Sequence, residues 1–200
     1  MTASAEPGPR ERVFRFGQSA IATPANYVTI ARIVLTVPTV ILIIDQGSSW
    51  LTVALWFLLT TTDGLDGWLA RRDGTTRSGA FLDPLADKAL VLGGFFALGI
   101  NGDFSWAAVA LVTAREVGIS VYRSFAGRRG ISLPARQLGK WKAVLQFSAV
   151  GVVLFPPMYS WATFHDIVLW IAVALSLLSG FDILRSGWVE QQEQKAENAV

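Results

Sequence analysis

Four aspartates lie close together within otherwise apolar sequence, and their spacing suits the binding of a cation. Asp63 and Asp66 are three positions apart, and Asp83 and Asp87 are four apart. If both segments are helical, each pair lies on one face of its helix. Carboxylate oxygens without histidine or cysteine favour a hard divalent cation, Mg²⁺ or Mn²⁺, over zinc. The pattern therefore predicts a metal site at which the two pairs converge.

The apolar surroundings of these aspartates argue for such a compensating cation. The apolar run at residues 50–62 is too short to cross a membrane, so its helix has to continue through Asp63 and Asp66. An ionised aspartate within a spanning helix costs about 2.5–3.5 kcal/mol, which a bound cation would offset. The alternative is neutralisation by neighbouring basic side chains, namely Arg71, Arg72, Arg77 and Lys88.

The composition fits an integral membrane protein. The 200 residues are 52% hydrophobic and 16% charged, and they include no cysteine, which excludes disulfides and a cysteine nucleophile. The net charge of +2 is too small for a nucleic-acid-binding surface, so we expect no nucleic-acid partner. We predict an all-α integral membrane protein in which six transmembrane helices form a bundle in the lipid bilayer. The predicted spans are residues 27–45, 50–71, 79–100, 106–125, 139–155 and 166–187.

The connections between these spans predict how the aspartates are positioned. The connector at 72–78 is short, so the second and third spans are antiparallel neighbours and their carboxylates can converge. Basic residues precede the first span and follow the second, fourth and sixth, whereas the other three connectors contain neither lysine nor arginine. This distribution predicts that both termini, and the aspartates, are on the cytoplasmic side. The basic residues concerned are Arg10, Arg12, Arg15, Arg72, Arg77, Arg128, Arg129, Arg136 and Lys195.

Three parts of the chain follow from this organisation. Residues 1–20 form an N-terminal cytoplasmic or interfacial segment, residues 21–189 the six-helix domain, and residues 190–200 a polar C-terminal tail. Tryptophans at the ends of three spans are expected at the boundary opposite the aspartates, as in an aromatic belt; these are Trp50, Trp106 and Trp161. We expect His165, the only histidine, to be a surface residue on that far side. Lys88 is expected to point elsewhere on its helix than Asp87, where it either reaches the membrane surface or balances the acidic cluster.

The residues around the aspartates resemble the signature of the CDP-alcohol phosphatidyltransferase family, Asp-x2-Asp-Gly-x2-Ala-Arg followed by Gly-x3-Asp-x3-Asp. All eight fixed positions are present, at Asp63, Asp66, Gly67, Ala70, Arg71, Gly79, Asp83 and Asp87. The resemblance implies transfer of a phosphatidyl group from CDP-diacylglycerol to an alcohol, with two Mg²⁺ or Mn²⁺ ions. It also implies a homodimer in a bacterial inner (plasma) membrane, as a multi-pass protein with its active site facing the cytoplasm.

The resemblance also assigns roles to particular residues. The four aspartates Asp63, Asp66, Asp83 and Asp87 would bind metal, and Asp87 would also be the catalytic general base. Thr76 stands where the family often has serine and keeps the hydroxyl. The residues implied to bind the CDP group are Asp66, Gly67, Ala70, Arg71, Thr76, Gly79, Asn26 and Thr29.

A second group of charged residues points to the acceptor. Arg115 and Arg123 are eight positions apart, about two helical turns, and Lys140 and Lys142 begin the fifth span. Guanidinium groups near the membrane suit a phosphate dianion, which predicts a phosphorylated acceptor bound by these four residues. The alternative for Arg115 is an ion pair with Glu116 or with another helix.

The sequence around this group resembles the phosphatidylglycerophosphate synthase branch of the family, which implies sn-glycerol 3-phosphate as acceptor and phosphatidylglycerophosphate as product. Inositol phosphate, and phosphatidylglycerol giving cardiolipin, remain alternative acceptors. A small cation transporter is an alternative of another class. It predicts polar groups continuing towards the outer side, where the spans are almost entirely apolar.

Overall fold

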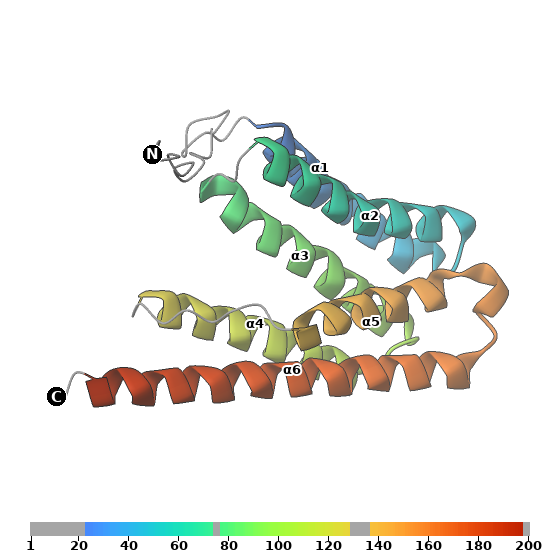
Figure 1. The fold of residues 1–200 in the computed structure, drawn as a ribbon. Coiled ribbons are helices and arrows are strands. Elements are labelled where there is room, and N and C mark those ends of the chain that lie inside the picture. Colours follow the sequence, from blue (N-terminus) through green and yellow to red (C-terminus); the bar gives the residue numbers. More distant parts are fainter. Residues whose placement is uncertain (1–22, 74–76, 129–136, 198–200) are drawn as a thin grey trace, which may run out of the picture.

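The computed structural model describes residues 23–73, 77–128 and 137–197. It describes the side chains of these residues except at positions 24, 25, 63–73, 77–81, 128 and 193–197. These ranges form six α-helices and one short 3₁₀ helix, and no β-strand occurs in them (Figure 1). The elements are α1 (Pro24–Gln46), α2 (Trp50–Asp73), α3 (Arg77–Asn101), α4 (Trp106–Arg128), α5 (Gln137–Leu154), η1 (Pro156–Met158) and α6 (Ala162–Glu197).

The all-α prediction of six helices is confirmed, and the helix ends have local causes. The side chain of Thr23 caps α1 by accepting a hydrogen bond from the backbone N–H of Asn26 at 3.2 Å. Gly47 has a φ of 59°, which turns the chain out of α1, while its N–H still donates to the carbonyl of Ile43. The helix α6 extends to Glu197, so most of the predicted tail 190–200 is helical. Its glutamates, glutamines, lysine and alanine are strong helix formers.

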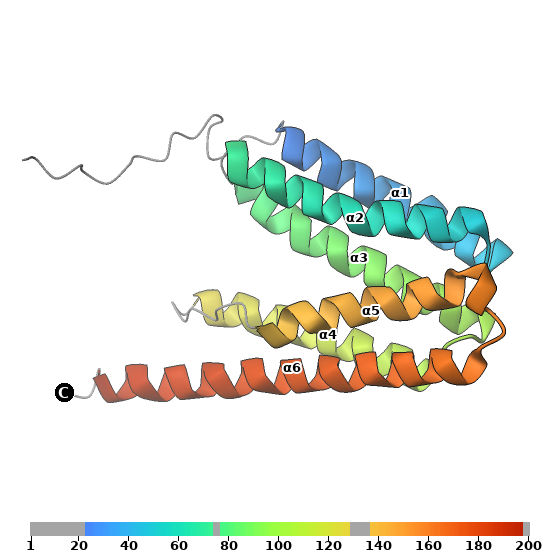
Figure 2. The same cartoon turned by 45° about the vertical axis from the view of Figure 1, so that its right-hand side comes forward.

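The helices form two groups of three. Figures 1 and 2 show α1, α2 and α3 together on one side, and α4, α5 and α6 on the other. The most extensive contacts are α1 with α3 and α2, and α6 with α5 and α4. The groups meet through α3 and through the pair α2 and α5. The beginning of α1 and the end of α6 lie at the same end of the bundle (Figure 2).

The buried core contains residues from all six helices, and Trp56 of α2 is among the largest of them. Trp56 is 1% exposed, and its indole N–H donates to the carbonyl of Phe147 at 3.1 Å. Two consecutive glycines allow α3 to come close to its neighbours. A Cβ at Gly94 would lie 2.7 Å from the Trp56 ring, and one at Gly93 would lie 2.7 Å from a Val40 methyl group. Side chains at these positions would therefore push the helices apart.

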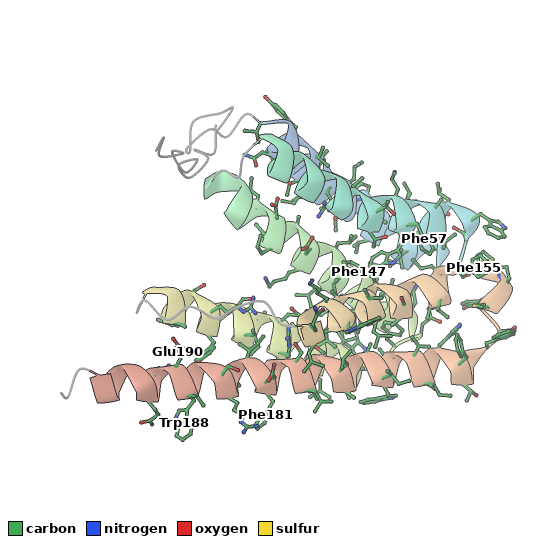
Figure 3. All side chains as sticks on the ribbon, viewed as in Figure 1. Phe57, Phe147, Phe155, Phe181, Trp188 and Glu190 are labelled. Carbon is green, nitrogen blue, oxygen red and sulfur yellow. The ribbon has the colours of Figure 1, made fainter. Side chains whose placement is uncertain are left out.

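The surface of the bundle is apolar, whereas several buried positions are polar. Outward-facing Val34 and Val37 on α1 are 62% and 60% exposed, and Phe181 on α6 is 67% exposed. Figure 3 shows Phe181 and Trp188 pointing away from the bundle. The buried polar side chains include Thr36, Thr39, Gln146, Ser176 and Ser179. This arrangement suits lipid surroundings, where polar groups gather inside a bundle and apolar groups contact the acyl chains.

Among the described residues, two helical stretches are long and apolar enough to cross a membrane. They are Asn26–Gln46 and Ala162–Gln192. Trp50–Thr62 is a shorter apolar stretch. The helices α3, α4 and α5 carry charged residues within their length, which lowers their mean hydropathy. Those of them whose side chains the structure describes line the pockets of the candidate site.

Candidate active site

The two aspartates of α3 are held by side chains of α1. The Thr29 hydroxyl donates to Asp83 Oδ1 at 2.8 Å. One turn further along α1, Arg32 Nη1 donates to Asp87 Oδ1 at 2.9 Å and forms a salt bridge with it. Thr29 and Arg32 are three positions apart and the aspartates are four apart, so the two contacts follow facing stripes of packed helices. The α1–α3 interface therefore orients both carboxylates.

Arg32 is a site residue that the sequence analysis missed. Its side chain is 1% exposed, whereas the Asp87 side chain with which it pairs is 41% exposed. The available signal was a charged residue in the middle of the first apolar span, because ionisable groups inside a membrane usually serve function. Asn26, another predicted site residue, is also buried near the start of α1.

For most of the other predicted metal and CDP ligands, the structure describes the backbone but not the side chain. Asp63, Asp66, Gly67, Ala70 and Arg71 lie in the last turns of α2, and Gly79 lies in the first turn of α3. Their side chains, and Thr76 altogether, lie outside the described residues. Within the described side chains, no three Asp, Glu, His or Cys residues form a group able to hold a metal. The metal ligands therefore stay a prediction.

The donor chemistry present fits such a site. Asp83 and Asp87 are half-buried and line a cavity of about 270 Å³ together with Pro84 and Lys88. The aspartates of α2 precede these along two helices that contact each other and are joined by a short connection. An oxygen-only set of carboxylates is the ligand type of Mg²⁺ and Mn²⁺.

The predicted acceptor residues lie together in a second cavity. Arg115, Arg123, Lys140 and Lys142 line a space of about 350 Å³ between α4, α5 and α6. Arg123 and Lys140 are exposed, which leaves their charges accessible from the surface. We call this space the basic pocket and the cavity around Asp83 and Asp87 the aspartate pocket.

The two pockets adjoin each other. Lys88, Glu116, Lys142 and Ala143 line both of them. Lys88 therefore borders the space around the aspartates, as expected if it balances the acidic cluster. Its ammonium group donates to the carbonyl of Pro84 at 3.2 Å, one turn back along α3. Lys88 thus joins the four predicted basic residues around the basic pocket, and it also borders the aspartate pocket.

Arg115 makes the ion pair that the sequence analysis left open as an alternative. Its Nη1 donates to Glu116 Oε1 at 3.0 Å. Its Nε donates to the carbonyl of Ser176, and its Nη2 donates to the Ser179 hydroxyl, each at 3.0 Å. Gly180 permits this approach to α6, because a Cβ there would lie 3.2 Å from Arg115 Cγ. The role of Arg115 in acceptor binding stays a prediction.

An apolar groove reaches the aspartate pocket. It has a volume of about 290 Å³ and runs between α2 and α5, past Trp56, Phe57, Gly151 and Phe155. Phe147 lines both the groove and the aspartate pocket. Figure 3 shows Phe57, Phe147 and Phe155 in this region of the molecule. The groove offers an apolar surface that leads from the charged site towards the opposite end of the bundle.

The opposite end contains a buried histidine. His165 is 7% exposed, so the expectation of a surface residue is wrong. The helix α6 begins at Ala162, before the predicted start at 166, which places His165 in a first turn that packs against the bundle. In the loop between α3 and α4, burial raises the pKa of Asp103, and the charge of His165 opposes the rise. Trp50 and Trp106 are exposed at the starts of α2 and α4, and Trp161 is exposed directly before α6.

A helical bundle with an apolar surface, and with charged side chains gathered around internal pockets, has the make-up of a membrane protein with a polar site. The chain belongs to the CDP-alcohol phosphatidyltransferase family, because the profile of that family matches residues 22–178. It is therefore a membrane transferase of phospholipid biosynthesis.

Curated relatives share most of its length. One is named a probable phosphatidylglycerophosphate synthase, from Mycobacterium tuberculosis, and is 36% identical over 83% of this chain and 82% of its own. Two are named CDP-diacylglycerol–glycerol-3-phosphate 3-phosphatidyltransferase. The one from Rickettsia typhi is 32% identical over 80% of this chain and 94% of its own. The one from Bacillus subtilis is 31% identical over 82% of this chain and 94% of its own.

Proposed function

We propose that this chain transfers the phosphatidyl group of CDP-diacylglycerol to sn-glycerol 3-phosphate, which yields phosphatidylglycerophosphate and CMP. The main support is the adjacency of the aspartate pocket and the basic pocket. The names of the relatives from Mycobacterium tuberculosis, Rickettsia typhi and Bacillus subtilis agree with this reaction. The acceptor carries a phosphate and a hydroxyl, so it needs both cations and a base.

The carboxylates of α2 and α3 would hold the catalytic metal, either Mg²⁺ or Mn²⁺ as a pair of ions. The residues concerned are Asp63, Asp66, Asp83 and Asp87. Bound there, the ions would supply positive charge to the pyrophosphate and to the departing CMP. Asn26, Thr29, Gly67, Ala70, Arg71, Thr76 and Gly79 would surround the CDP group.

Asp87 acts as the general base in this proposal. Its carboxylate takes the proton of the acceptor hydroxyl while the hydroxyl oxygen attacks the β-phosphorus of CDP-diacylglycerol. The new phosphorus–oxygen bond forms as the bond to CMP breaks, and CMP carries away the electron pair. Arg32 fixes the orientation of Asp87 through Oδ1, and Thr29 fixes that of Asp83. Both contacts come from the rigid α1 helix, which favours a pre-organised site.

The basic pocket would hold the phosphate of the acceptor. Arg123 and Lys140 are exposed there, and Lys142 lies between this pocket and the aspartates. Charge-assisted hydrogen bonds from several cations suit a phosphate dianion. A phosphate bound near Lys142 would direct the hydroxyl at the other end of glycerol 3-phosphate towards Asp87.

The lipid substrate would lie partly in the apolar groove between α2 and α5, with its charged end at the aspartates. The distribution of basic residues and the exposed Trp50, Trp106 and Trp161 support a cytoplasmic site in the cell membrane. We also propose a homodimer, as the family resemblance implies. This arrangement gives a water-soluble acceptor access from the cytoplasm and a lipid donor access from the bilayer.

The test is CMP release by purified protein in detergent with CDP-dioleoylglycerol and Mg²⁺ or Mn²⁺. Glycerol 3-phosphate, inositol phosphate and phosphatidylglycerol are supplied separately, and the Asp87→Asn variant is measured alongside. We expect metal-dependent release with glycerol 3-phosphate, and none with the variant. Release with another acceptor instead would reject the proposed acceptor, and release that persists in the variant would reject the proposed base.

A further inference from the structure

Glu116 is a buried carboxylate that the proposed reaction does not use. It lies in the middle of α4 and is 5% exposed. A carboxylate inside a membrane protein is costly unless its charge is compensated. A single oxygen of Glu116, Oε1, accepts hydrogen bonds from Lys142 Nζ at 2.6 Å, from Arg115 Nη1 at 3.0 Å and from Gln146 Nε2 at 3.3 Å. Two cations and an amide therefore converge on this atom.

The partners of Glu116 depend on it to different degrees. Arg115 is also bonded to the Ser176 carbonyl and the Ser179 hydroxyl of α6. Gln146 also reaches the hydroxyl of Ser176, at 3.3 Å. Lys142 has its hydrogen bond to Glu116, and its side chain is 12% exposed. Removal of the Glu116 charge would therefore release Lys142 more than it would release Arg115.

Lys142 lies at the border between the proposed acceptor site and the aspartates. It lines both the aspartate pocket and the basic pocket, as Glu116 does. A lysine is a long and flexible side chain with three donors, so its ammonium group has no fixed position unless a partner provides one. A carboxylate beside it fixes this position at the border of the two pockets. Glu116 itself would repel a phosphate, so it does not act as a ligand of the acceptor.

We propose that Glu116 is a positioning residue, which holds the Lys142 ammonium group at the border of the two pockets for the phosphate of the acceptor. The inference rests on the proposed function only in requiring that the acceptor carries a phosphate. It adds a residue to the acceptor site that acts through another side chain. The opposing possibility is that Glu116 only joins α4, α5 and α6 as a structural contact.

Kinetics of the Glu116→Gln variant separate these roles. The amide keeps the size of the side chain and removes its charge. We expect KM for glycerol 3-phosphate to rise by about 10-fold, since the phosphate loses a well-placed charge-assisted hydrogen bond from Lys142. KM for CDP-dioleoylglycerol should not change, and Glu116→Asp should recover part of the loss. An equal rise in both KM values, or an unchanged KM for the acceptor, would overturn the proposal.

A second comparison uses Lys142→Met and the double variant Glu116→Gln with Lys142→Met. The double variant lacks Glu116 and Lys142 together, so it retains no unpaired Lys142 charge, which matters if Glu116→Gln alone fails to fold. Arg115 stays and keeps its hydrogen bonds to Ser176 and Ser179. If Glu116 acts through Lys142, the double variant should have the same acceptor KM as Lys142→Met. A further rise of about 10-fold in the double variant would contradict this path. Glu190→Gln, at an exposed glutamate of α6 (Figure 3), is the matched control and should match the wild type.

Binding of inorganic phosphate gives a readout that does not need turnover. Calorimetric titration of the purified protein should show phosphate binding that weakens by about 10-fold in Glu116→Gln. Equal phosphate affinity in the wild type and the variant would overturn the proposal. If the wild type transfers to inositol phosphate instead, the proposed acceptor fails. The same KM comparison, made with inositol phosphate, then decides the role of Glu116 separately.

Discussion

Replacement of Arg32 by methionine tests whether α1 is part of the active site. The change removes the charge and the hydrogen bond from Arg32 Nη1 to Asp87 Oδ1, but it keeps an apolar side chain of similar length inside the α1–α3 interface. The Asp87 side chain is 41% exposed, so water can reach it after the loss. The variant should therefore fold, with Asp87 less well oriented.

The contact itself sets the size of the expected effect. A hydrogen bond to a charged group contributes about 1.5–3 kcal/mol. The exposure of Asp87 reduces the electrostatic part of this contribution, which places the expected loss towards the lower end. Since about 1.4 kcal/mol corresponds to a factor of 10, kcat/KM should fall about 10-fold, and by no more than about 100-fold.

The assay is CMP release at varied glycerol 3-phosphate and varied CDP-dioleoylglycerol, for protein that elutes as a single species in detergent. Arg32→Lys keeps the charge and should recover part of the activity. Arg185→Met, at an exposed arginine of α6, is the matched control and should be as active as the wild type. Wild-type kcat/KM in folded Arg32→Met would refute the role assigned to this residue.

Three further changes address other parts of the structure. Thr29→Val removes the hydroxyl that donates to Asp83 and should lower kcat/KM about 10-fold, as measured by CMP release, with little change in melting temperature. Gly151→Leu should fill the groove between α2 and α5 and slow transfer from CDP-dioleoylglycerol more than from CDP-dioctanoylglycerol; equal slowing would contradict a lipid role for the groove. Burial raises the pKa of Asp103 above its ordinary value of 3.8. The folded state therefore binds the proton of the Asp103 carboxyl more tightly than the unfolded state does. The free energy of unfolding falls as pH rises from the ordinary pKa to the raised pKa of the folded state. Asp103→Asn should raise the melting temperature at neutral pH. The difference in melting temperature between variant and wild type should narrow as pH falls. A difference that stays constant across pH would be evidence against this linkage.

The helices and the grouping of charged residues were predictable because both depend on residues close together in the sequence. Apolar stretches and their connectors predicted six helices, and the spacing of Asp83 and Asp87 predicted a shared face of α3. The basic residues predicted for the acceptor line one pocket. Helix propensity and periodicity decide these features, and they act over only a few turns.

The pairings between helices were not predictable in the same way. The contact of Arg32 with Asp87 joins residues 55 positions apart and depends on the register of α1 against α3. Burial of His165 depends on where α6 begins and on how it packs against the bundle. The position of Lys88 depends on the rotation of α3, which a sequence pattern of four residues does not determine. Such features follow from tertiary packing, and single-sequence patterns do not contain it.

The most direct test of the proposed reaction is the identity of the lipid that the protein makes. Purified protein is incubated with CDP-dioleoylglycerol, a divalent cation and an equimolar mixture of glycerol 3-phosphate, inositol phosphate and phosphatidylglycerol, and the lipids are analysed by mass spectrometry. We expect phosphatidylglycerophosphate as the product, formed by the wild type and absent with Asp87→Asn. A phosphatidylinositol phosphate or cardiolipin as the main product, or a variant that is as active as the wild type, would contradict the proposal.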